Sequence, residues 1–214
     1  PGYPAYRALA GLAEAEAVPY ALDAANGCRL DPTAFEAALE DHLRVRVAVL
    51  NHPSNPTGGG ASREALAAVA RACEGRGILL VSDEVYRELH FGEPVPSLRD
   101  VSHGGVVIES ASKGWAAPGL RVGWAVGEPR WLAPARTVHA FAVTAASEPC
   151  QRAVLALLEA SPSVLEASRR ELVCRWETLG KAFQKHLGTC PARPDGGFYH
   201  WMPLPAGAGE DPLA

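Results

Sequence analysis

Residues 106–126 read VVIESASKGWAAPGLRVGWAV, and this stretch decides the fold class. Its first apolar run, residues 106–109, predicts a strand, and residues 122–126 predict a second one. The loop between them, residues 111–121, offers 11 positions. That is slightly fewer than the roughly twelve or more that a parallel crossover needs. The second strand is therefore expected to run antiparallel to the first.

The sequence upstream of this stretch alternates between predicted strands and helices. An Asp31-Pro32 pair starts a helix, because aspartate caps a helix and proline suits its first turn. Residues 45–50 then predict a strand that runs into the proline-rich turn 51–58. A helix follows over residues 62–75, and residues 78–81 predict a buried parallel strand. The pattern indicates an α/β protein: a three-layer, mostly parallel sheet with helices on both faces.

The last part of the chain is predicted to open a second, smaller unit. Residues 163–187 carry a long apolar stripe at helical spacing, which is typical of core packing. Residues 196–202, GGFYHWM, predict a turn that enters a strand. We expect a large domain over residues 1–160, and over residues 161–214 a connector helix with the truncated start of a smaller α+β domain. Because Pro1 stands where an initiator methionine would, we expect a fragment that lacks the N-terminal part of the large domain.

Composition and charge narrow the function classes. The formal net charge of −4 gives no basic field for holding a phosphate backbone, so no nucleic acid is expected as a partner. No apolar run reaches the roughly 18 residues that span a bilayer, so no membrane partner is expected either. The 5 cysteines include no C-x-x-C pair, which predicts reduced thiols in a cytoplasmic protein and no metal site.

Lys113 is the candidate for the central chemical role. It is the only lysine in the first 180 residues of a chain that has seventeen arginines and three lysines. An amine can lose a proton and attack a carbonyl, whereas a guanidinium stays protonated. Asn55, Asp83 and Ser110 also follow predicted strands, and functional groups gather at the carboxyl ends of strands in open α/β sheets. These side chains are therefore expected to share one site.

Four motifs occur in a fixed order. They are Asn55-Pro56-Thr57-Gly58, Asp83-Glu84-Val85-Tyr86, Ser110-Ala111-Ser112-Lys113, and Arg121 eight positions after the lysine. In order and spacing they resemble the fold-type I pyridoxal-phosphate enzymes, specifically the class I and II aminotransferase family. The resemblance spans most of the chain. It implies pyridoxal 5'-phosphate as the cofactor, an amino acid and a 2-oxo acid as substrates, and a homodimer with active sites at the subunit interface.

The resemblance also assigns roles to single residues. Lys113 would form the Schiff base with the cofactor and then act as general acid and base. Asp83 would keep the pyridine nitrogen protonated, so that the ring accepts electrons from the substrate. Tyr3, in the opening segment PGYPAY, would place its aromatic ring against the cofactor.

Four further residues would hold the cofactor. Asn55 and Tyr86 would donate hydrogen bonds to its phenolate oxygen, and Ser110 and Arg121 would bind its phosphate. A glycine-rich phosphate turn is expected upstream of Tyr3. An arginine for the substrate carboxylate is expected beyond the last residue.

Two polar neighbours of these motifs are given no direct role. Glu84 is expected to be a helix-start charge that the helix dipole favours. His52 is not expected to be the catalytic base, because the proton shuttle of the family is the lysine.

The motifs leave the reaction open between several outcomes. Transamination is the expected activity, but a carbon–sulfur lyase, a decarboxylase or a cyclising lyase of the same family would carry much the same signatures. A different class is a regulator in which an aminotransferase-like domain senses pyridoxal phosphate behind a DNA-binding helix-turn-helix. Such sensors tend to replace the Asn-Pro-Thr-Gly motif, which is intact at residues 55–58.

Overall fold

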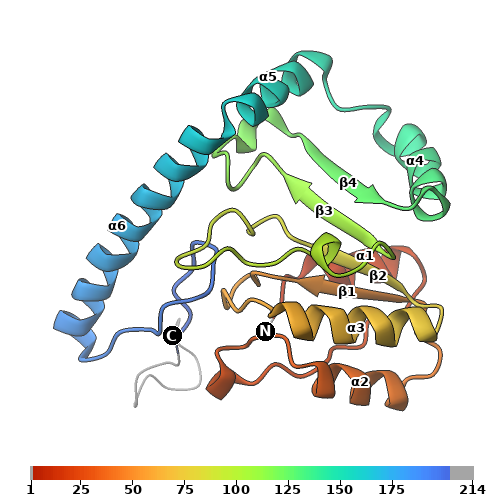
Figure 1. Ribbon diagram of the computed structural model, residues 1–214, viewed down its shortest axis with the longest axis horizontal. Helices are drawn as coiled ribbons and strands as arrows, with labels where there is room; N and C mark the ends of the chain where they lie inside the picture. Colours follow the sequence, from red (N-terminus) through yellow and green to blue (C-terminus); the bar gives the residue numbers. More distant parts are fainter. Residues whose placement is uncertain (1, 203–214) are drawn as a thin grey trace.

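A computed structural model describes residues 2–202 of the chain (Figure 1). Its sheet has four strands in the order of the sequence. These are β1 (Val47–Asn51), β2 (Leu79–Asp83), β3 (Val106–Ser110) and β4 (Gly123–Gly127). Strands β1, β2 and β3 are parallel, and β4 pairs with β3 in the antiparallel sense. The predicted direction of the last strand is therefore confirmed.

Helices surround this mixed sheet, so the α/β class is confirmed as well. They are α1 (Ala5–Leu12), α2 (Pro32–Asp41), α3 (Arg63–Gly75), α4 (Pro129–Val143), α5 (Glu148–Glu159) and α6 (Ser161–Leu187). Three short 3-10 turns are η1 (Ala24–Asn26), η2 (Leu98–Asp100) and η3 (Pro118–Leu120). In Figure 1, α2 and α3 lie together beneath β1, whereas α5 and α6 run along the opposite end of the molecule.

The main core lies between the sheet and the layer formed by α2 and α3. Leu50 on β1 and Leu80 on β2 point into it, where they meet Leu66 and Val69 of α3, which are fully buried. Alternate residues of β2 are only half buried, so its burial follows a two-residue period. Residues 78–81 were expected to be buried on both faces. In the described part of the chain, they are buried on one.

Local signals position the helix that covers the core. The Ser62 hydroxyl accepts a hydrogen bond from the Ala65 N–H at 3.1 Å, which satisfies one of the free donors of the first turn of α3. Gly77 follows the helix with a φ of 64°, in the left-handed region that glycine enters without strain. The Asp31 carboxylate caps α2 in the same way, through the Thr33 N–H at 2.8 Å.

A second apolar cluster lies where α5 packs against the lysine loop. Val154 of α5 is buried with Ala111 and Val122, and Trp124 of β4 lies at its margin. Helix α6 then leaves this cluster as a rod of 27 residues (Figure 1). It covers the segment in which a long helix was predicted. Arg169 of α6 contacts the loop that follows β2, where its guanidinium donates a hydrogen bond to the Glu88 carbonyl at 3.3 Å.

The segment after α6 packs back against the part of the chain that carries the sheet. The strand predicted within residues 196–202 is wrong. Within residues 196–202 the structure has an isolated antiparallel bridge between Gly196 and His90 but no strand. Gly197 takes a φ of 85°, and a side chain on Gly196 would collide with Pro53. This segment is therefore a tight turn against the body instead of a pleated strand. The rest of the predicted small domain, residues 203–214, lies outside the described residues.

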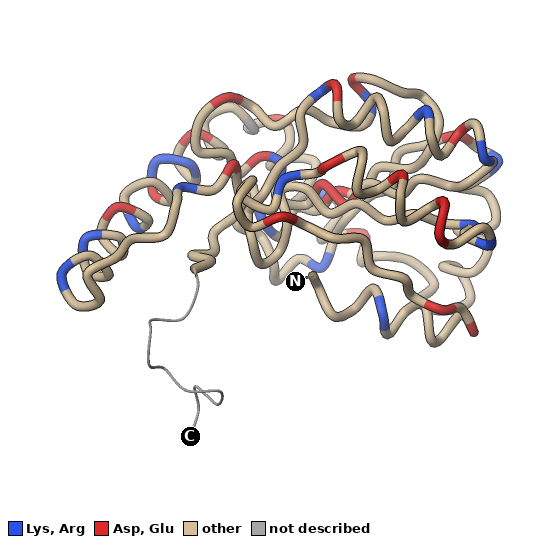
Figure 2. Tube along the Cα trace, turned by 90° about the horizontal axis from the view of Figure 1, so that it is seen from below, with Lys and Arg blue, Asp and Glu red and all other residues tan. Residues whose placement is uncertain are grey.

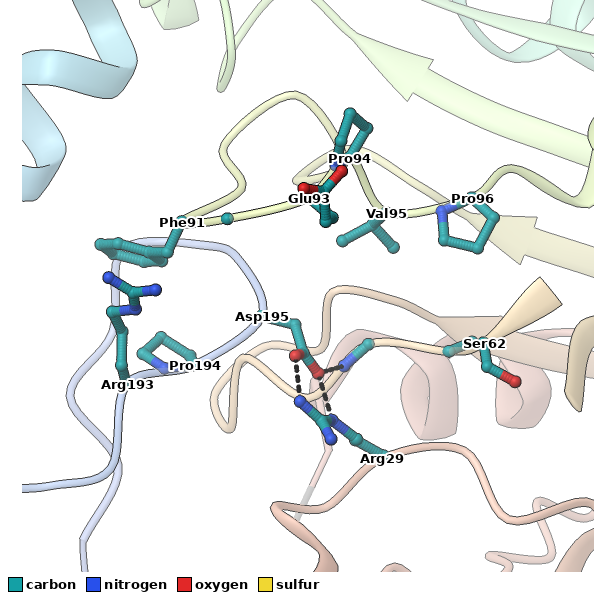
Figure 3. A pocket seen from close by; sticks show the side chains of 13 residues that line it. Arg29, Ser62, Phe91, Glu93, Pro94, Val95, Pro96, Arg193, Pro194 and Asp195 are labelled. Atoms are coloured by element: carbon teal, nitrogen blue, oxygen red, sulfur yellow. Dashed lines mark hydrogen bonds and ion pairs between the residues drawn. The ribbon is translucent and has the colours of Figure 1, made fainter.

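An ion pair closes the same return turn (Figure 3). The guanidinium of Arg29 contacts the Asp195 carboxylate, which also accepts from the Gly60 N–H at 2.8 Å. Burial raises the pKa of Asp195, but these donors outweigh burial and hold its pKa below the ordinary value. A cavity of about 360 Å³ lies beside this pair, between residues 91–96 and 193–195. None of the predicted site residues lines it.

Charges of both signs are interspersed over the trace instead of being gathered by sign (Figure 2). Among the helices described, none has the combination of length and apolarity that a bilayer crossing demands.

Candidate active site

Strand register brings the predicted motifs to one edge of the sheet. Asn51 at the end of β1 lies opposite Asp83 at the end of β2. Asp83 in turn lies opposite Ile108, two residues before the end of β3 at Ser110. Because the three strands are parallel, their carboxyl ends open at the same edge. The loops that carry Asn55 and Lys113 start there.

Asp83 is held by contacts from its own loop and from two other parts of the chain. Its Oδ2 accepts a hydrogen bond from the Tyr6 hydroxyl at 2.5 Å, and its Oδ1 accepts from the Val85 N–H at 3.3 Å. The Asn51 side chain donates to the Asp83 carbonyl at 3.2 Å and accepts from the Asn55 N–H at 2.8 Å. Asn51 therefore ties the Asn55 turn to the strand end that carries the carboxylate.

Lys113 points at aromatic rings. Its Nζ lies 5.3 Å from the centroid of the Tyr86 ring and 5.4 Å from that of Phe198. Tyr86 is buried, three residues after Asp83, and its hydroxyl lies 3.1 Å from the Tyr199 hydroxyl. Burial raises the pKa of Tyr86, and the contact with Tyr199 raises it further. In the described residues, no carboxylate forms an ion pair with Lys113, so its neighbours are ring faces and a protonated phenol.

Ser110 and Arg121 flank the lysine loop at its two ends. Ser110 pairs with Gly123 across the β3–β4 ladder, so the backbones at the two ends lie side by side. The Ser110 hydroxyl donates to the Val122 carbonyl at 3.3 Å and accepts from the Ser112 N–H at 3.1 Å. Arg121 is exposed, and its guanidinium donates to the Pro118 carbonyl at 2.8 Å. The backbones of Ser110 and Arg121 therefore lie close together. The Arg121 guanidinium, however, contacts a carbonyl of its own loop.

Tyr3 reaches the site through its neighbour Tyr6. The two rings meet edge to face, with centroids 5.7 Å apart at 81°, and Tyr3 is 47% exposed. Asn55 is half buried in the turn that Asn51 anchors. All seven predicted residues thus lie at or beside the same edge of the sheet, although Tyr3 and Arg121 stand at its margin.

Three contributors were missed in the sequence: Tyr6, Asn51 and Phe198. Tyr6 stands three positions after Tyr3, a spacing that puts two side chains on one side of a helical turn, so its proximity could have been noticed. Asn51 ends a predicted strand, as Asp83 does. Phe198 is 43% exposed in a turn that was predicted to be a strand, and no local pattern pointed to it.

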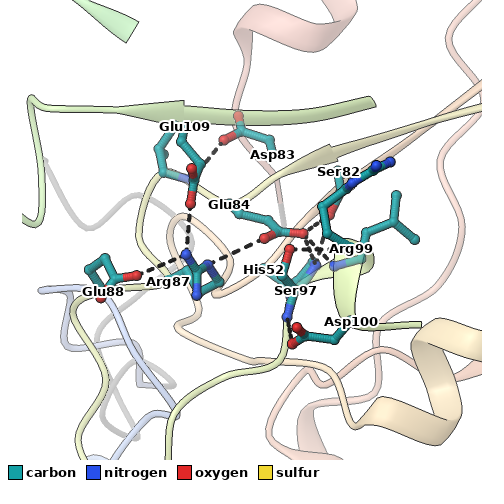
Figure 4. A network of polar contacts seen from close by, with 12 residues as sticks. His52, Ser82, Asp83, Glu84, Arg87, Glu88, Ser97, Arg99, Asp100 and Glu109 are labelled. Atoms are coloured by element: carbon teal, nitrogen blue, oxygen red, sulfur yellow. Dashed lines mark hydrogen bonds and ion pairs between the residues drawn. The ribbon is translucent and has the colours of Figure 1, made fainter. Parts of the chain in front are cut away.

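A buried polar network lies behind Asp83 (Figure 4). Glu84 is 2% exposed, and its Oε1 accepts from the Ser82 hydroxyl and from the Leu98 N–H, both at 2.8 Å. His52 Nε2 lies 2.9 Å from that hydroxyl and 3.6 Å from Glu84 Oε1. Glu84 was expected to be a helix-start charge, and this is wrong. No helix begins there, and the carboxylate points into the core.

The network continues to the lysine loop through Arg87. Its guanidinium lies 3.4 Å from Glu84 Oε2 and donates to Glu109 Oε1 at 2.8 Å, while Trp124 Nε1 donates to Glu109 Oε2 at 2.8 Å. Burial raises the pKa of Glu84, but His52 and the donors at Leu98 and Ser97 outweigh burial, and the net pKa lies below its ordinary value. A buried carboxylate thus stays ionised directly behind Asp83.

Replacing Glu84 by glutamine is expected to destabilise the full-length protein by about 2 kcal/mol at neutral pH, because buried donors and Arg87 lose a charged acceptor. A carboxylate whose folded pKa is depressed stabilises the fold above its unfolded pKa, and this contribution is lost as pH falls through the folded pKa. The difference between wild type and Glu84→Gln should therefore shrink as pH falls below the ordinary glutamate range. Urea unfolding across pH measures it.

The control for this change is Glu36→Gln, on the exposed side of α2. It removes the same charge from the surface and is expected to change the unfolding free energy by less than about 0.5 kcal/mol. Equal unfolding free energies for the two variants at neutral pH would contradict the stabilising role of the Glu84 network.

Comparison with known proteins gives a consistent result. A family model described as aminotransferase class I and II matches residues 1–211. An arginine–pyruvate transaminase of Pseudomonas aeruginosa is 34% identical over 202 residues, which are 93% of this chain and 51% of that protein. An LL-diaminopimelate aminotransferase of Desulforudis audaxviator is 33% identical over 217 residues, with 97% of this chain and 53% of that protein covered.

Solved structures agree with these relatives. A tetra mutant of Thermus thermophilus aspartate aminotransferase superimposes with a TM-score of 0.83 at 28% identity, over 92% of this chain and 54% of that one. N-succinyldiaminopimelate aminotransferase from Mycobacterium tuberculosis superimposes with a TM-score of 0.81 at 28% identity, over 92% of this chain and 52% of that one. The chain spans about half the length of the relatives it matches.

Proposed function

This chain belongs to the class I and II aminotransferase family, and we propose that the whole protein moves an amino group between an amino acid and a 2-oxo acid. The family and its fold depend on pyridoxal 5'-phosphate. The observation that carries the proposal is that Lys113 and Asp83 both act on the buried Tyr86 at the carboxyl edge of the sheet: the Lys113 amine lies 5.3 Å from the centroid of its ring, and the charge of Asp83 helps to raise its pKa.

The residues present fit that cofactor. The Lys113 amine forms no ion pair with a carboxylate among the described side chains, and it lies over the rings of Tyr86 and Phe198, where it is proposed to bind an aldehyde. The Asp83 carboxylate offers an acceptor for a protonated ring nitrogen. When bound, the cofactor supplies an aldehyde and a ring that accepts electrons. Lys113 Nζ then acts as general acid and base, and moves a proton to and from the substrate Cα.

The other predicted residues would hold the cofactor in place. Tyr86 is buried and its raised pKa keeps the phenol protonated, so its hydroxyl is suited to donate to a phenolate oxygen, together with Asn55. Ser110 and Arg121 are proposed for the phosphate, as hydroxyl and guanidinium donors at the ends of the lysine loop. Tyr3 is proposed to place its ring against the cofactor.

Substrates are proposed at the level of class. The two relatives are named for different amino acids, arginine and LL-diaminopimelate, and both names describe amino-group transfer. They support an amino acid donor and a 2-oxo acid acceptor for this protein. They do not favour a lyase, a decarboxylase or a regulator.

A homodimer and two domains complete the proposal. Helix α4 exposes Phe141 at 89% and Val138 at 69%, and α1 exposes Leu12 at 83%. Large exposed apolar side chains of this kind are typical of a surface that another subunit covers.

We propose that residues 1–160 belong to the cofactor-binding large domain, and that residues 161–214 form the connector helix and the start of the small domain. The cytoplasm is proposed as the compartment.

The reaction is tested with the full-length protein, pyridoxal phosphate, and a panel of ¹⁵N-labelled amino acids, each with unlabelled pyruvate or 2-oxoglutarate. We expect the label in the newly formed alanine or glutamate, in equal amount to the 2-oxo acid released from the donor. Mass spectrometry of both products measures this. Label in free ammonia would favour a lyase, carbon dioxide release a decarboxylase, and cofactor binding without any product a regulator; each contradicts transamination.

A further inference from the structure

The contact between Tyr6 and Asp83 joins residues 77 positions apart in the sequence. The Tyr6 hydroxyl lies 2.5 Å from Asp83 Oδ2, which is the length of a strong hydrogen bond to an ionised acceptor. Burial raises the pKa of Tyr6 well above its ordinary value, and the charge and the hydrogen bond of Asp83 raise it further. The phenol therefore keeps its proton, and in this pair Tyr6 is the donor and Asp83 the acceptor.

Helix α1 fixes where this donor lies. Tyr6 is in the first turn of α1, and its ring packs edge to face against the ring of Tyr3. The opposite oxygen, Asp83 Oδ1, accepts only the N–H of Val85 at 3.3 Å among the described donors. One oxygen is thus occupied by a rigid donor from another element, and the other oxygen retains acceptor capacity. Because each oxygen accepts from one donor, rotation of the carboxylate plane is restricted as well.

We propose that Tyr6 is a positioning residue, which orients the Asp83 carboxylate toward the ring nitrogen of pyridoxal phosphate. The inference rests on the proposed function, because it concerns the same site. An acceptor must be held within about 0.5 Å and 20° of its working geometry for its charge to act on a ligand. The Val85 N–H belongs to the same loop as Asp83 and moves with it, whereas Tyr6 is attached to α1 and sets the carboxylate from outside.

A purely structural role, in which Tyr6 only ties α1 to β2, makes a different prediction. It would lower the melting temperature and leave the protonation of the bound cofactor unchanged. Positioning instead changes how firmly the ring nitrogen holds its proton. The ¹⁵N chemical shift of that nitrogen separates the two roles, because it reports protonation directly.

The test uses the full-length protein with pyridoxal phosphate labelled at the ring nitrogen. In Tyr6→Phe, which removes only the hydroxyl, we expect the dissociation constant of the cofactor to rise about tenfold, consistent with one lost hydrogen bond to a charged group. We also expect the ring nitrogen to lose its proton at lower pH than in wild type. The kcat should fall about tenfold, with less than a twofold change in KM for the amino donor.

The matched control is Tyr20→Phe. Tyr20 is a tyrosine of the main core, edge to face with Phe35 at 5.4 Å, and loses the same hydroxyl far from Asp83 in the sequence and in another cluster. It is expected to keep the wild-type cofactor affinity and ring-nitrogen titration. Tyr6→His, whose ring N–H can donate to the same carboxylate, is expected to recover part of the affinity that Tyr6→Phe loses. Tyr6→Leu also lacks the donor and replaces Tyr6→Phe if that variant does not fold.

The outcomes separate cleanly. Wild-type ring-nitrogen titration and cofactor affinity in Tyr6→Phe, or in Tyr6→Leu where Tyr6→Phe does not fold, would overturn the inference alone. A wild-type protein that binds no pyridoxal phosphate would overturn the proposed function and the inference with it. Loss of the ring-nitrogen proton at lower pH in Tyr6→Phe or Tyr6→Leu, but not in Tyr20→Phe, supports the positioning role.

Discussion

Replacing Lys113 by alanine is expected to lower the transamination rate of the full-length protein by about 10⁴-fold or more, because one amine both binds the cofactor and transfers the proton. Lys113→Arg is expected to lose as much. A guanidinium keeps the positive charge beside Tyr86 but stays protonated at any pH at which the protein is folded. Single-turnover kinetics with the preferred amino donor measures both variants.

The matched control is Lys181→Ala, on an exposed position of α6. It removes an ammonium from the surface and is expected to keep kcat within about twofold. Retention of more than about a tenth of the wild-type rate in Lys113→Arg would show that the position needs only a positive charge, and the account of Lys113 would be wrong.

Asp83→Asn is expected to lower kcat/KM by about 10² to 10³, the usual cost of removing one charged stabilising group from an active site. The amide is nearly isosteric, and its single oxygen can still accept from the Tyr6 hydroxyl, so that only the longer contact with the Val85 N–H is lost and the fold is expected to survive. What is lost is the negative charge that favours a protonated ring nitrogen. Asp83→Glu keeps the charge but displaces it, and a partial loss between the two values is expected.

Steady-state kinetics across pH measures these variants against Asp41→Asn, an exposed change at the end of α2. The control is expected to behave as wild type. An Asp83→Asn enzyme within about threefold of wild type would contradict the role given to the carboxylate.

Much of the fold could be predicted because its signals are local. The Ser62 cap, the Asp31-Pro32 helix start and the short loop before β4 each depend on a few adjacent residues. The grouping of Asn55, Asp83 and Lys113 could also be predicted. Parallel strands send their carboxyl ends to one edge, so the order of strands and motifs is sufficient.

The direction of single side chains could not be predicted in the same way. Glu84 follows Asp83 in a sequence that suits a helix start, yet its carboxylate turns into the core because Ser82 and Leu98 offer donors there. The contact of Leu98 with Glu84 spans 14 positions, and the contact of Tyr6 with Asp83 spans 77. Hydrophobic periodicity carries no information at such separations.

The strand prediction at residues 196–202 was wrong although the local sequence pattern favoured it. Its apolar residues match a strand pattern, but the backbone must pass between Pro53 and the Leu89 carbonyl, where only glycine fits. The packing partner, distant in the sequence, therefore overrides the local preference.

The central claim, that Lys113 is the amine that binds the cofactor aldehyde, is tested most directly by trapping that bond. The full-length protein is mixed with pyridoxal phosphate, reduced with borohydride and digested with trypsin. We predict the reduced cofactor on a single peptide, residues 100–121, left uncut at Lys113 because the modified amine resists the protease. Cofactor recovered on another lysine, or equal labelling of the Lys113→Ala variant, would contradict the account.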